Sequence, residues 1–230
     1  MNVQSTAEEA RGENFVLHAP TSSLTQESGF GVYKFSKRGV DFVISLLFLL
    51  LAFVPLLLVA LLVSCTSRGP VLFKQKRLGL GGEIFWCLKF RTMVVNAEEV
   101  LRQNIELQAQ FSSDFKLKND PRITPVGQFL RKTSLDELPQ FVNVLRGEMS
   151  LIGPRPIVPL EISKYGLHGD KLLTVKPGLG GLWQASGRSD VTYEERITMD
   201  MSYIDSRSLR GDLMLLLLTA ASVCRSRGAY

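Results

Sequence analysis

The pattern of apolar and polar positions divides the chain at one long apolar run, residues 42–63, which contains no charged side chain. A helix rises about 1.5 Å per residue, so about 20 apolar residues cover the hydrocarbon core of a bilayer. A soluble helix is seldom apolar on every face over such a length. The run therefore predicts membrane insertion of a segment that covers residues 34–66.

The flanks and the centre of this run bear on how it enters the bilayer. Lys and Arg residues stand on both sides of it, although positive charge marks the cytoplasmic side. Pro55, near the centre, removes a backbone hydrogen bond and bends a helix. Both features favour a re-entrant helix that returns to the cytoplasmic face. A straight span with a tolerated proline stays open on the residues alone.

The segments on either side of the run differ in charge. Residues 1–33 are polar and acidic without a sustained apolar period, so we expect a mobile tail. Residues 67–230 are basic and long enough for one globular unit. A basic body favours polyanions such as nucleic acid, anionic lipid or a phosphorylated substrate, and charge does not choose among them. The three cysteines are far apart and in no metal-ligand spacing, which argues against disulfides or a zinc site and for a reducing compartment.

Most of the remaining pattern is helical. Residues 71–90 form two apolar stretches around a glycine turn and predict a β-hairpin. Helical spacing recurs in five further segments: 96–111, 125–133, 136–146, 158–176 and 194–207. The apolar run over residues 213–224 is too short to span and predicts a buried or interfacial helix. The expected fold class is α+β, mainly helical, with a re-entrant membrane helix, a β-hairpin and amphipathic interfacial helices around a small cytosolic catalytic domain.

Two adjacent carboxylates, Asp136 and Glu137, stand at the start of one of these helices and allow two interpretations. Ser134 and Glu137 match a capping box, and Asp136 suits a first helical turn electrostatically. A helix that began after Ser134 would place Pro139 beyond its first turn, where the proline ring clashes with the carbonyl four residues earlier. The helix is therefore expected to begin at Asp136. A helix cap and a catalytic pair are equally favoured by these residues alone.

Three other motifs are candidates for anion contact. In residues 89–93, with the sequence KFRTM, two cations share one face of a strand, which is more often a solvated edge than an anion site. Arg155 stands between two prolines in the GPRP motif, which suits a phosphate clamp and a structural turn equally. The glycines of residues 177–181 let the backbone approach another group closely. The glycines of residues 79–82 lack the Lys-Ser or Lys-Thr of a P-loop and predict a turn.

Taken together and in this order, these segments resemble the bacterial sugar transferase family. The resemblance runs from Lys34 to the C-terminus and rests on the apolar segment with its central proline and on four motifs: KFRTM at 89–93, SLDELPQ at 134–140, GPRP at 153–156 and PG…GR at 177–188. The family comprises monotopic polyprenyl-phosphate phosphoglycosyl transferases. The short form of this chain is most similar to the members that initiate exopolysaccharide synthesis.

The resemblance implies an activity and a location. A member would transfer a sugar-1-phosphate from a UDP-sugar to undecaprenyl phosphate through a covalent phosphosugar-aspartate intermediate, with release of UMP. It would act on the cytoplasmic face of the bacterial inner membrane, held in the lipid bilayer by a re-entrant helix that breaks at Pro55. The family often has Ser before this proline, whereas this chain has Val54, which leaves the geometry of the break open.

The resemblance also implies roles for single residues. Asp136 matches the nucleophile with Glu137 beside it, and Mg²⁺ is implied at Asp136 as the counter-charge for the diphosphate. Phosphate or nucleotide contacts are implied for four cations: Lys89, Arg131, Arg155 and Arg188. Two further carboxylates match polar positions of the family and are implied to orient those cations: Asp200 and Asp212.

Two other classes of function are alternatives to a sugar transferase. A membrane-tethered scaffold or adaptor that binds anionic lipid or an acidic partner is compatible with the basic charge. Nucleic-acid binding is disfavoured, because the aromatic residues are not interleaved with the basic ones as a stacking surface requires. The sequence does not indicate which sugar is transferred, and it leaves a homodimer open.

Overall fold

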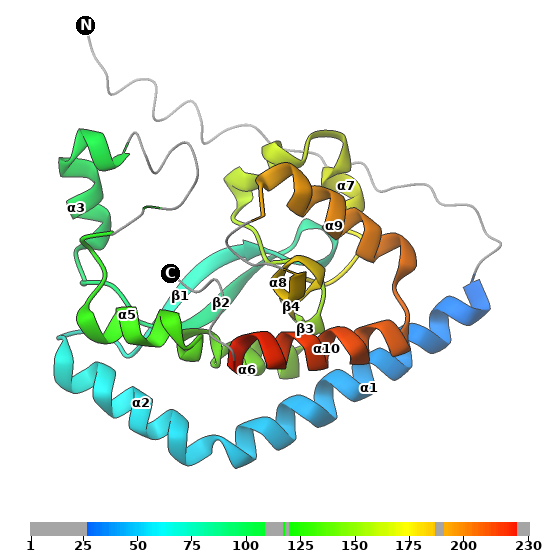
Figure 1. Ribbon diagram of the computed structural model, residues 1–230, viewed down its shortest axis with the longest axis horizontal. Helices are drawn as coiled ribbons and strands as arrows, with labels where there is room; N and C mark the ends of the chain where they lie inside the picture. Colours follow the sequence, from blue (N-terminus) through cyan, green and yellow to red (C-terminus); the bar gives the residue numbers. More distant parts are fainter. Residues whose placement is uncertain (1–26, 109–116, 118–119, 187–190, 225–230) are drawn as a thin grey trace, which may run out of the picture.

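The computed structural model describes residues 27–108, 117, 120–186 and 191–224. A mainly helical body lies against a long bent pair of helices, α1 and α2 (Figure 1). The N-terminal half contains α1 (Glu27–Leu51), α2 (Phe53–Thr66), β1 (Leu72–Leu78), β2 (Ile84–Phe90), α3 (Ala97–Gln103), α5 (Pro125–Lys132) and α6 (Gln140–Arg146). The C-terminal half contains β3 (Ser150–Ile152), α7 (Gly169–Leu172), β4 (Gly178–Gly180), α8 (Leu182–Ser186), α9 (Tyr193–Ser206) and α10 (Leu209–Cys224). The mainly helical fold with a small β content is confirmed.

The apolar run forms two helices instead of one. α1 ends at Leu51 and α2 begins at Phe53, and the two are bent by 65° relative to each other. Pro55 accounts for the break, because it has no amide to donate to the Leu51 carbonyl and its ring crowds that oxygen. In the described part of the chain, no single helix is long and apolar enough to cross a membrane. The bent pair reaches that length and apolarity only when its two helices are taken together.

α1 begins earlier than the sequence pattern indicated. Its first residue is Glu27, so the end of the mobile tail expected over residues 1–33 is helical, and the rest of that tail lies outside the described residues. Two side chains of this first part of α1, Tyr33 and Lys37, both donate to the carboxylate of Asp212 in α10 at 2.8 Å. These bonds to a distant helix order a stretch whose own composition is polar.

The hairpin predicted over residues 71–90 is confirmed. β1 and β2 pair antiparallel along their whole length, around a turn in which Gly81 has a φ of +69°. One side chain of α6 forms hydrogen bonds with backbone groups on the other edge of β2. The Asn143 amide accepts from the Leu88 N–H at 3.0 Å and donates to the Trp86 carbonyl at 2.8 Å. This buried amide fixes α6 to the hairpin.

The amphipathic helix expected over residues 96–111 is short and interrupted. The Asn104 side chain accepts from the Leu107 N–H at 3.0 Å and caps a new turn after α3. No residue of α3 is buried, and Ile105 is 82% exposed, so the apolar face does not pack on the core. The last part of the expected helix, residues 109–111, lies outside the described residues.

The glycine-rich segment after Pro177 forms β4, which pairs parallel with β3. The two backbones are so close that a Cβ on Gly178 would lie 2.1 Å from the Gly153 nitrogen. Glycine is required there for steric reasons, and the group that it approaches is the GPRP motif itself. The pairing fixes the backbone from which Arg155 extends.

The C-terminal helices follow their local signals. α9 carries the capping box of Thr192 and Glu195, close to the helix predicted over residues 194–207. α10 begins at Leu209, before the predicted start at residue 213, so Asp212 lies inside the helix. Residues 158–176 are helical in part, with a 3-10 stretch over Pro159–His168 followed by α7.

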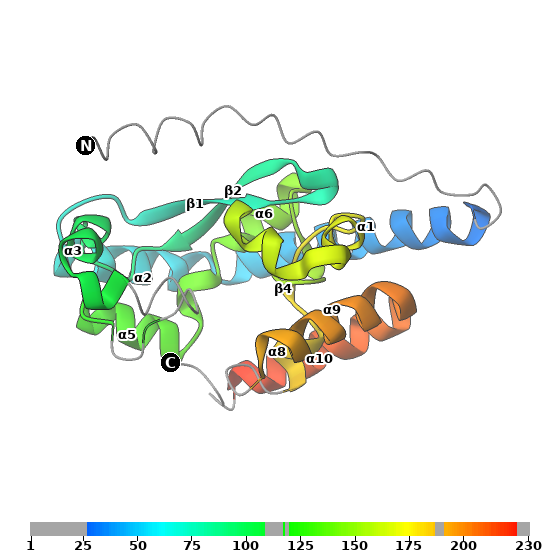
Figure 2. The same cartoon turned by 90° about the horizontal axis from the view of Figure 1, so that it is seen from above.

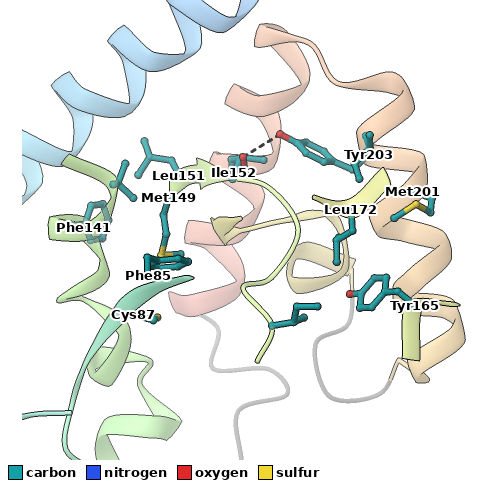
Figure 3. Close-up of a cluster of buried hydrophobic side chains, with 13 residues drawn as sticks. Phe85, Cys87, Phe141, Met149, Leu151, Ile152, Tyr165, Leu172, Met201 and Tyr203 are labelled. Carbon is teal, nitrogen blue, oxygen red and sulfur yellow. Dashed lines mark hydrogen bonds between the residues drawn. The ribbon is translucent and has the colours of Figure 1, made fainter. Parts of the chain in front are cut away.

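The core gathers side chains from both halves of the chain (Figure 3): Phe85, Cys87, Phe141, Met149, Leu151, Ile152, Tyr165, Leu172, Met201 and Tyr203. Viewed from above, the hairpin lies on one side of α1, and α9 and α10 lie on the other (Figure 2). The Phe48 ring of α1 stacks on Phe141 of α6 with ring centroids 3.9 Å apart. Arg38 donates to the carbonyls of Val144 and Leu145 in the last turn of α6. The bent pair is thereby fixed to the helix that follows the two carboxylates.

Candidate active site

The carboxylates Asp136 and Glu137 lie in a short 3-10 turn, Leu135–Glu137, between α5 and α6. Ser134 has a φ of +56° and its side chain makes no cap bond, and α6 begins only after Pro139. The predicted helix start at Asp136 is therefore wrong, and the capping box is not formed. The left-handed backbone at Ser134 turns the chain, and the fixed φ of Pro139 makes it the first boundary residue of α6.

Two of the predicted cations approach this turn from different elements. Lys89 extends from β2, and its Nζ lies 2.7 Å from Glu137 Oε1. Arg155 extends from the GPRP motif, and its guanidinium lies 3.6 Å from the same oxygen. The expectation of a solvated strand edge is wrong, because Lys89 is half-buried and Arg91 is buried with its guanidinium bound to the Ser67 carbonyl at 2.6 Å.

Arg131 approaches from the last turn of α5. Its Nε donates to the hydroxyl oxygen of Thr92 at 3.0 Å. Its charge acts on Asp136, and it forms no salt bridge with a carboxylate among the described residues. Three cations from three separate segments thus surround one buried carboxylate and its neighbour.

The surroundings raise the pKa of Asp136 and lower the pKa of Glu137. Burial and the charge of Glu137 raise the pKa of Asp136, and Lys89 and Arg131 offset only part of this rise. Burial acts on Glu137 in the same direction, but Lys89 and Arg155 outweigh it and lower the pKa of Glu137 below its usual range. As the pH falls, Asp136 is therefore the first of the pair to take up a proton. Ionised Asp136 is a stronger base than an ordinary aspartate.

A small pocket with both polar and apolar lining opens beside Glu137. Its lining includes three cations and two amide side chains: Arg77, Lys89, Arg155, Gln140 and Gln184. Arg77 of β1, which the sequence did not single out, donates to the Pro156 carbonyl at 2.7 Å and so holds the GPRP backbone. The pocket is electropositive, which suits a phosphorylated ligand.

Asp200 does not contact the predicted cations. It is buried in α9, accepts from the Tyr165 hydroxyl at 2.8 Å and lies 3.8 Å from Arg196 Nε. Burial raises the pKa of Asp200 to about 6. Arg196 packs on the Trp183 ring at 5.3 Å, and Arg155 packs on the same ring at 6.0 Å. Asp200 is thus connected to the site only through intermediate side chains.

Asp212 joins three helices instead of orienting a predicted cation. It accepts from Lys37 of α1 at 2.8 Å and from Tyr203 of α9 at 2.9 Å. The fourth predicted cation, Arg188, lies outside the described residues. Of the residues missed at the sequence level, Arg196 carried a signal, since it stands one helical turn before Asp200.

The carboxylates present fit one mode of Mg²⁺ binding. Among the described residues, no group of three or more His, Cys, Asp or Glu side chains suits a metal ion. Mg²⁺ is commonly bound by one or two protein carboxylates, with phosphates and water completing its shell. Glu137 is paired with cations, whereas Asp136 forms no salt bridge with a described residue. The site therefore fits a magnesium ion that arrives with a phosphorylated substrate and does not fit a cage built by protein alone.

Comparison with known proteins confirms the family expected from the motifs. The family model described as bacterial sugar transferase matches residues 32–226, and the chain belongs to this family. It is similar to the exopolysaccharide production protein ExoY of Rhizobium meliloti, with 45% identity over 200 residues, which are 85% of this chain and 88% of that protein.

Longer relatives carry names that state a reaction. The chain is 47% identical to an undecaprenyl-phosphate galactose phosphotransferase of Salmonella typhimurium over 201 residues. These residues are 86% of this chain and 42% of that protein. It is 39% identical to a UDP-glucose:undecaprenyl-phosphate glucose-1-phosphate transferase of Escherichia coli over 209 residues. These residues are 87% of this chain and 42% of that protein. The chain thus spans less than half the length of these two relatives.

Proposed function

We propose that the chain transfers a sugar-1-phosphate from a UDP-sugar to undecaprenyl phosphate, as the first membrane step of exopolysaccharide or related glycan assembly. The names of the relatives support this class of substrates. The observation that carries the proposal is the buried Asp136 beside Glu137, surrounded by Lys89, Arg131 and Arg155. A phosphoryl group needs a nucleophile and a concentration of positive charge, and this turn offers both.

The transfer proceeds by two displacements at one phosphorus atom. An oxygen of the Asp136 carboxylate attacks the phosphorus that carries the sugar. The bond from this phosphorus to the bridging oxygen breaks, and UMP leaves with that oxygen and the bonding electrons. A phosphate oxygen of undecaprenyl phosphate then attacks the same phosphorus and releases the carboxylate of Asp136. The elevated basicity of Asp136 favours the first attack, and the cations stabilise the charge on the equatorial oxygens.

Glu137 has a supporting role in this proposal. Its carboxylate holds Lys89 at 2.7 Å and Arg155 at 3.6 Å on the side of the turn that faces the pocket. It thereby keeps two cations in place before the substrate arrives, which lowers the cost of ordering them during the reaction. Its pKa stays low, so it remains ionised while Asp136 reacts.

Asp136 would hold the Mg²⁺ that the family implies, together with oxygens of the diphosphate. Such an ion would neutralise part of the negative charge that otherwise repels a carboxylate nucleophile from a diphosphate. Chelation of Mg²⁺ is therefore expected to stop UMP release, and added Mg²⁺ is expected to restore it.

The α1–α2 pair acts as a re-entrant helix on the cytoplasmic face of a bacterial inner membrane in this proposal. Support comes from apolar side chains that are exposed on both helices: Phe42, Val43, Leu46, Leu47, Leu50, Leu51, Phe53, Val54, Leu57, Leu58, Leu61 and Leu62. α10 contacts α1 and exposes Leu213, Met214, Leu217 and Leu218, as an interfacial helix does. The reacting lipid would then meet the site at the membrane surface.

UMP release tests the proposal. The purified chain is incubated with a UDP-sugar, undecaprenyl phosphate and Mg²⁺, and UMP is measured beside the same reaction of Asp136→Asn. We expect sustained UMP release only when undecaprenyl phosphate is present, and no more than one UMP per protein molecule without it. The variant should lose at least about a thousandfold of this activity. Full activity of Asp136→Asn excludes this residue as the nucleophile. A membrane-tethered adaptor, in contrast, would release no UMP with any UDP-sugar and would be indifferent to Asp136.

A further inference from the structure

Thr92, in the KFRTM motif, is a buried polar residue to which the proposed function gives no role. It lies two residues after the end of β2 and is 7% exposed. Its hydroxyl oxygen accepts a hydrogen bond from Arg131 Nε at 3.0 Å. A hydrogen bond to a charged group is stronger than one between neutral groups, so this contact constrains the guanidinium.

One face of α5 holds the Thr92 backbone independently of this hydroxyl. The Thr124 N–H at the start of α5 donates to the Thr92 carbonyl at 3.0 Å. Gly127 lies so close that a Cβ on it would be 1.9 Å from the same carbonyl oxygen. Arg131 is one helical turn further on the same face and returns to the hydroxyl. The backbone contacts fix the packing of the two segments, and the hydroxyl fixes only the Arg131 side chain.

This arrangement decides which edge of the guanidinium remains for a ligand. Nε is taken by Thr92, and the two terminal nitrogens of Arg131 make no hydrogen bond to a described residue. The charge of Arg131 lowers the pKa of Asp136, and α5 contacts the turn that carries this carboxylate. Two parallel N–H groups on one edge match two oxygens of a phosphoryl group.

We propose that Thr92 is a positioning residue that orients the terminal nitrogens of Arg131 toward the phosphoryl group at Asp136. The inference rests on the proposed function and deepens it. The phosphoryl group comes either from the diphosphate of the nucleotide sugar or from the phosphate of the lipid acceptor. These two sources share one chemistry, and separate kinetic constants for the two substrates distinguish them.

The test compares Thr92→Val, which keeps the shape and removes the hydrogen-bonding hydroxyl, with Thr92→Ser, which keeps the hydroxyl. Thr198→Val, at an exposed position of α9, is the matched control for the same substitution. We expect Thr92→Val to lower kcat/KM for the UDP-sugar about 10- to 100-fold, the loss that corresponds to a hydrogen bond with a charged partner. Thr92→Ser and Thr198→Val are expected to stay near wild type. A loss confined to the KM of undecaprenyl phosphate supports the same role toward the lipid phosphate.

A merely structural role is separated by repeating the comparison in an Arg131→Met background. If Thr92 acts through Arg131, Thr92→Val causes little further loss there. An equal loss in both backgrounds, or a Thr92→Val enzyme with wild-type constants, overturns the inference. Binding of UDP, followed by titration calorimetry, gives the same comparison without turnover. Weaker binding by Thr92→Val but not Thr92→Ser supports the inference even if the wild type released no UMP, an outcome that would reject the proposed function alone.

Discussion

The Nζ of Lys89 lies 2.7 Å from Oε1 of Glu137, and this pair connects the β-hairpin to the turn that carries Asp136. The same contact has two effects. It holds a cation beside the reacting carboxylate, and it keeps Glu137 ionised. The negative charge of Glu137 then contributes to the raised pKa of Asp136. Charge pairing on one residue thus sets the basicity of the next.

Replacing Lys89 with Met is expected to move the acid limb of activity to higher pH. Lys89 lowers the pKa of Asp136 as well as that of Glu137, so without this cation the already raised pKa of Asp136 rises further. Asp136 must be ionised to attack, so activity is lost as the pH falls through its pKa. The pH profile of kcat/KM measures the shift, with an activity loss of about 10-fold or more at neutral pH. Lys74→Met, at an exposed position of β1, is the control, and an acid limb shared by Lys89→Met and the wild type contradicts the coupling.

Asp136→Asn is expected to be inactive but more stable than the wild type at neutral pH. The pKa of Asp136 is raised in the folded state, so its charge opposes folding at every pH above the folded pKa. The difference in unfolding midpoint should amount to a few degrees, about 2–8 °C, and should vanish below the unfolded pKa, where both states are protonated. Thermal unfolding between pH 4 and pH 8 measures it. The exposed Asp205→Asn serves as control, and a destabilised Asp136→Asn protein at neutral pH disagrees with this account.

Trp183 is expected to position Arg155. Its ring is shared by Arg155 at 6.0 Å and by Arg196 at 5.3 Å, and Arg196 is held by Glu161 at 3.2 Å. A cation–π contact contributes about 0.5–2 kcal/mol, so Trp183→Leu should lower kcat/KM roughly 3- to 30-fold. Trp183→Phe keeps a ring and should lose less. Trp86→Leu is a matched control, because Trp86 is exposed and packs on Lys76 away from the carboxylates, and equal losses in the two Trp183 variants refute the role.

Both ends of the bent pair are expected on the same side of the membrane. Single cysteines at Lys34 and Arg68, which flank the apolar run, are introduced into a protein without its native cysteines. A membrane-impermeant thiol reagent should label both positions in inverted vesicles and neither in intact spheroplasts. Labelling of the two positions from opposite sides rejects the re-entrant arrangement in favour of a straight span.

Local signals in the sequence were sufficient for several elements. α5 begins at Pro125, where the helical spacing predicted a helix, and α9 covers most of the helix predicted over residues 194–207. The hairpin turn likewise follows from its glycines. These features depend on contacts within a few residues, which a single sequence records directly.

The turn at Asp136 was not predictable in the same way. The left-handed backbone of Ser134 belongs to a non-glycine residue, a conformation that its residue type does not predict. The parallel pairing of β3 and β4 involves strands too short to show a period. The Thr92–Arg131 hydrogen bond joins residues from separate elements, so no local spacing in the sequence predicts it. The motifs indicated which residues matter, while the tertiary fold decided which of them meet.

The central claim is that Asp136 carries the phosphosugar during transfer, and the mass of the protein tests it most directly. The wild type is mixed with a UDP-sugar and Mg²⁺ without undecaprenyl phosphate, quenched within seconds and digested for mass spectrometry. We predict a sugar-phosphate adduct on the peptide that contains Asp136, with UMP released in proportion, and its loss when undecaprenyl phosphate is added. Rapid turnover of UDP-sugar and lipid with no adduct at Asp136 at any time point would contradict the covalent route.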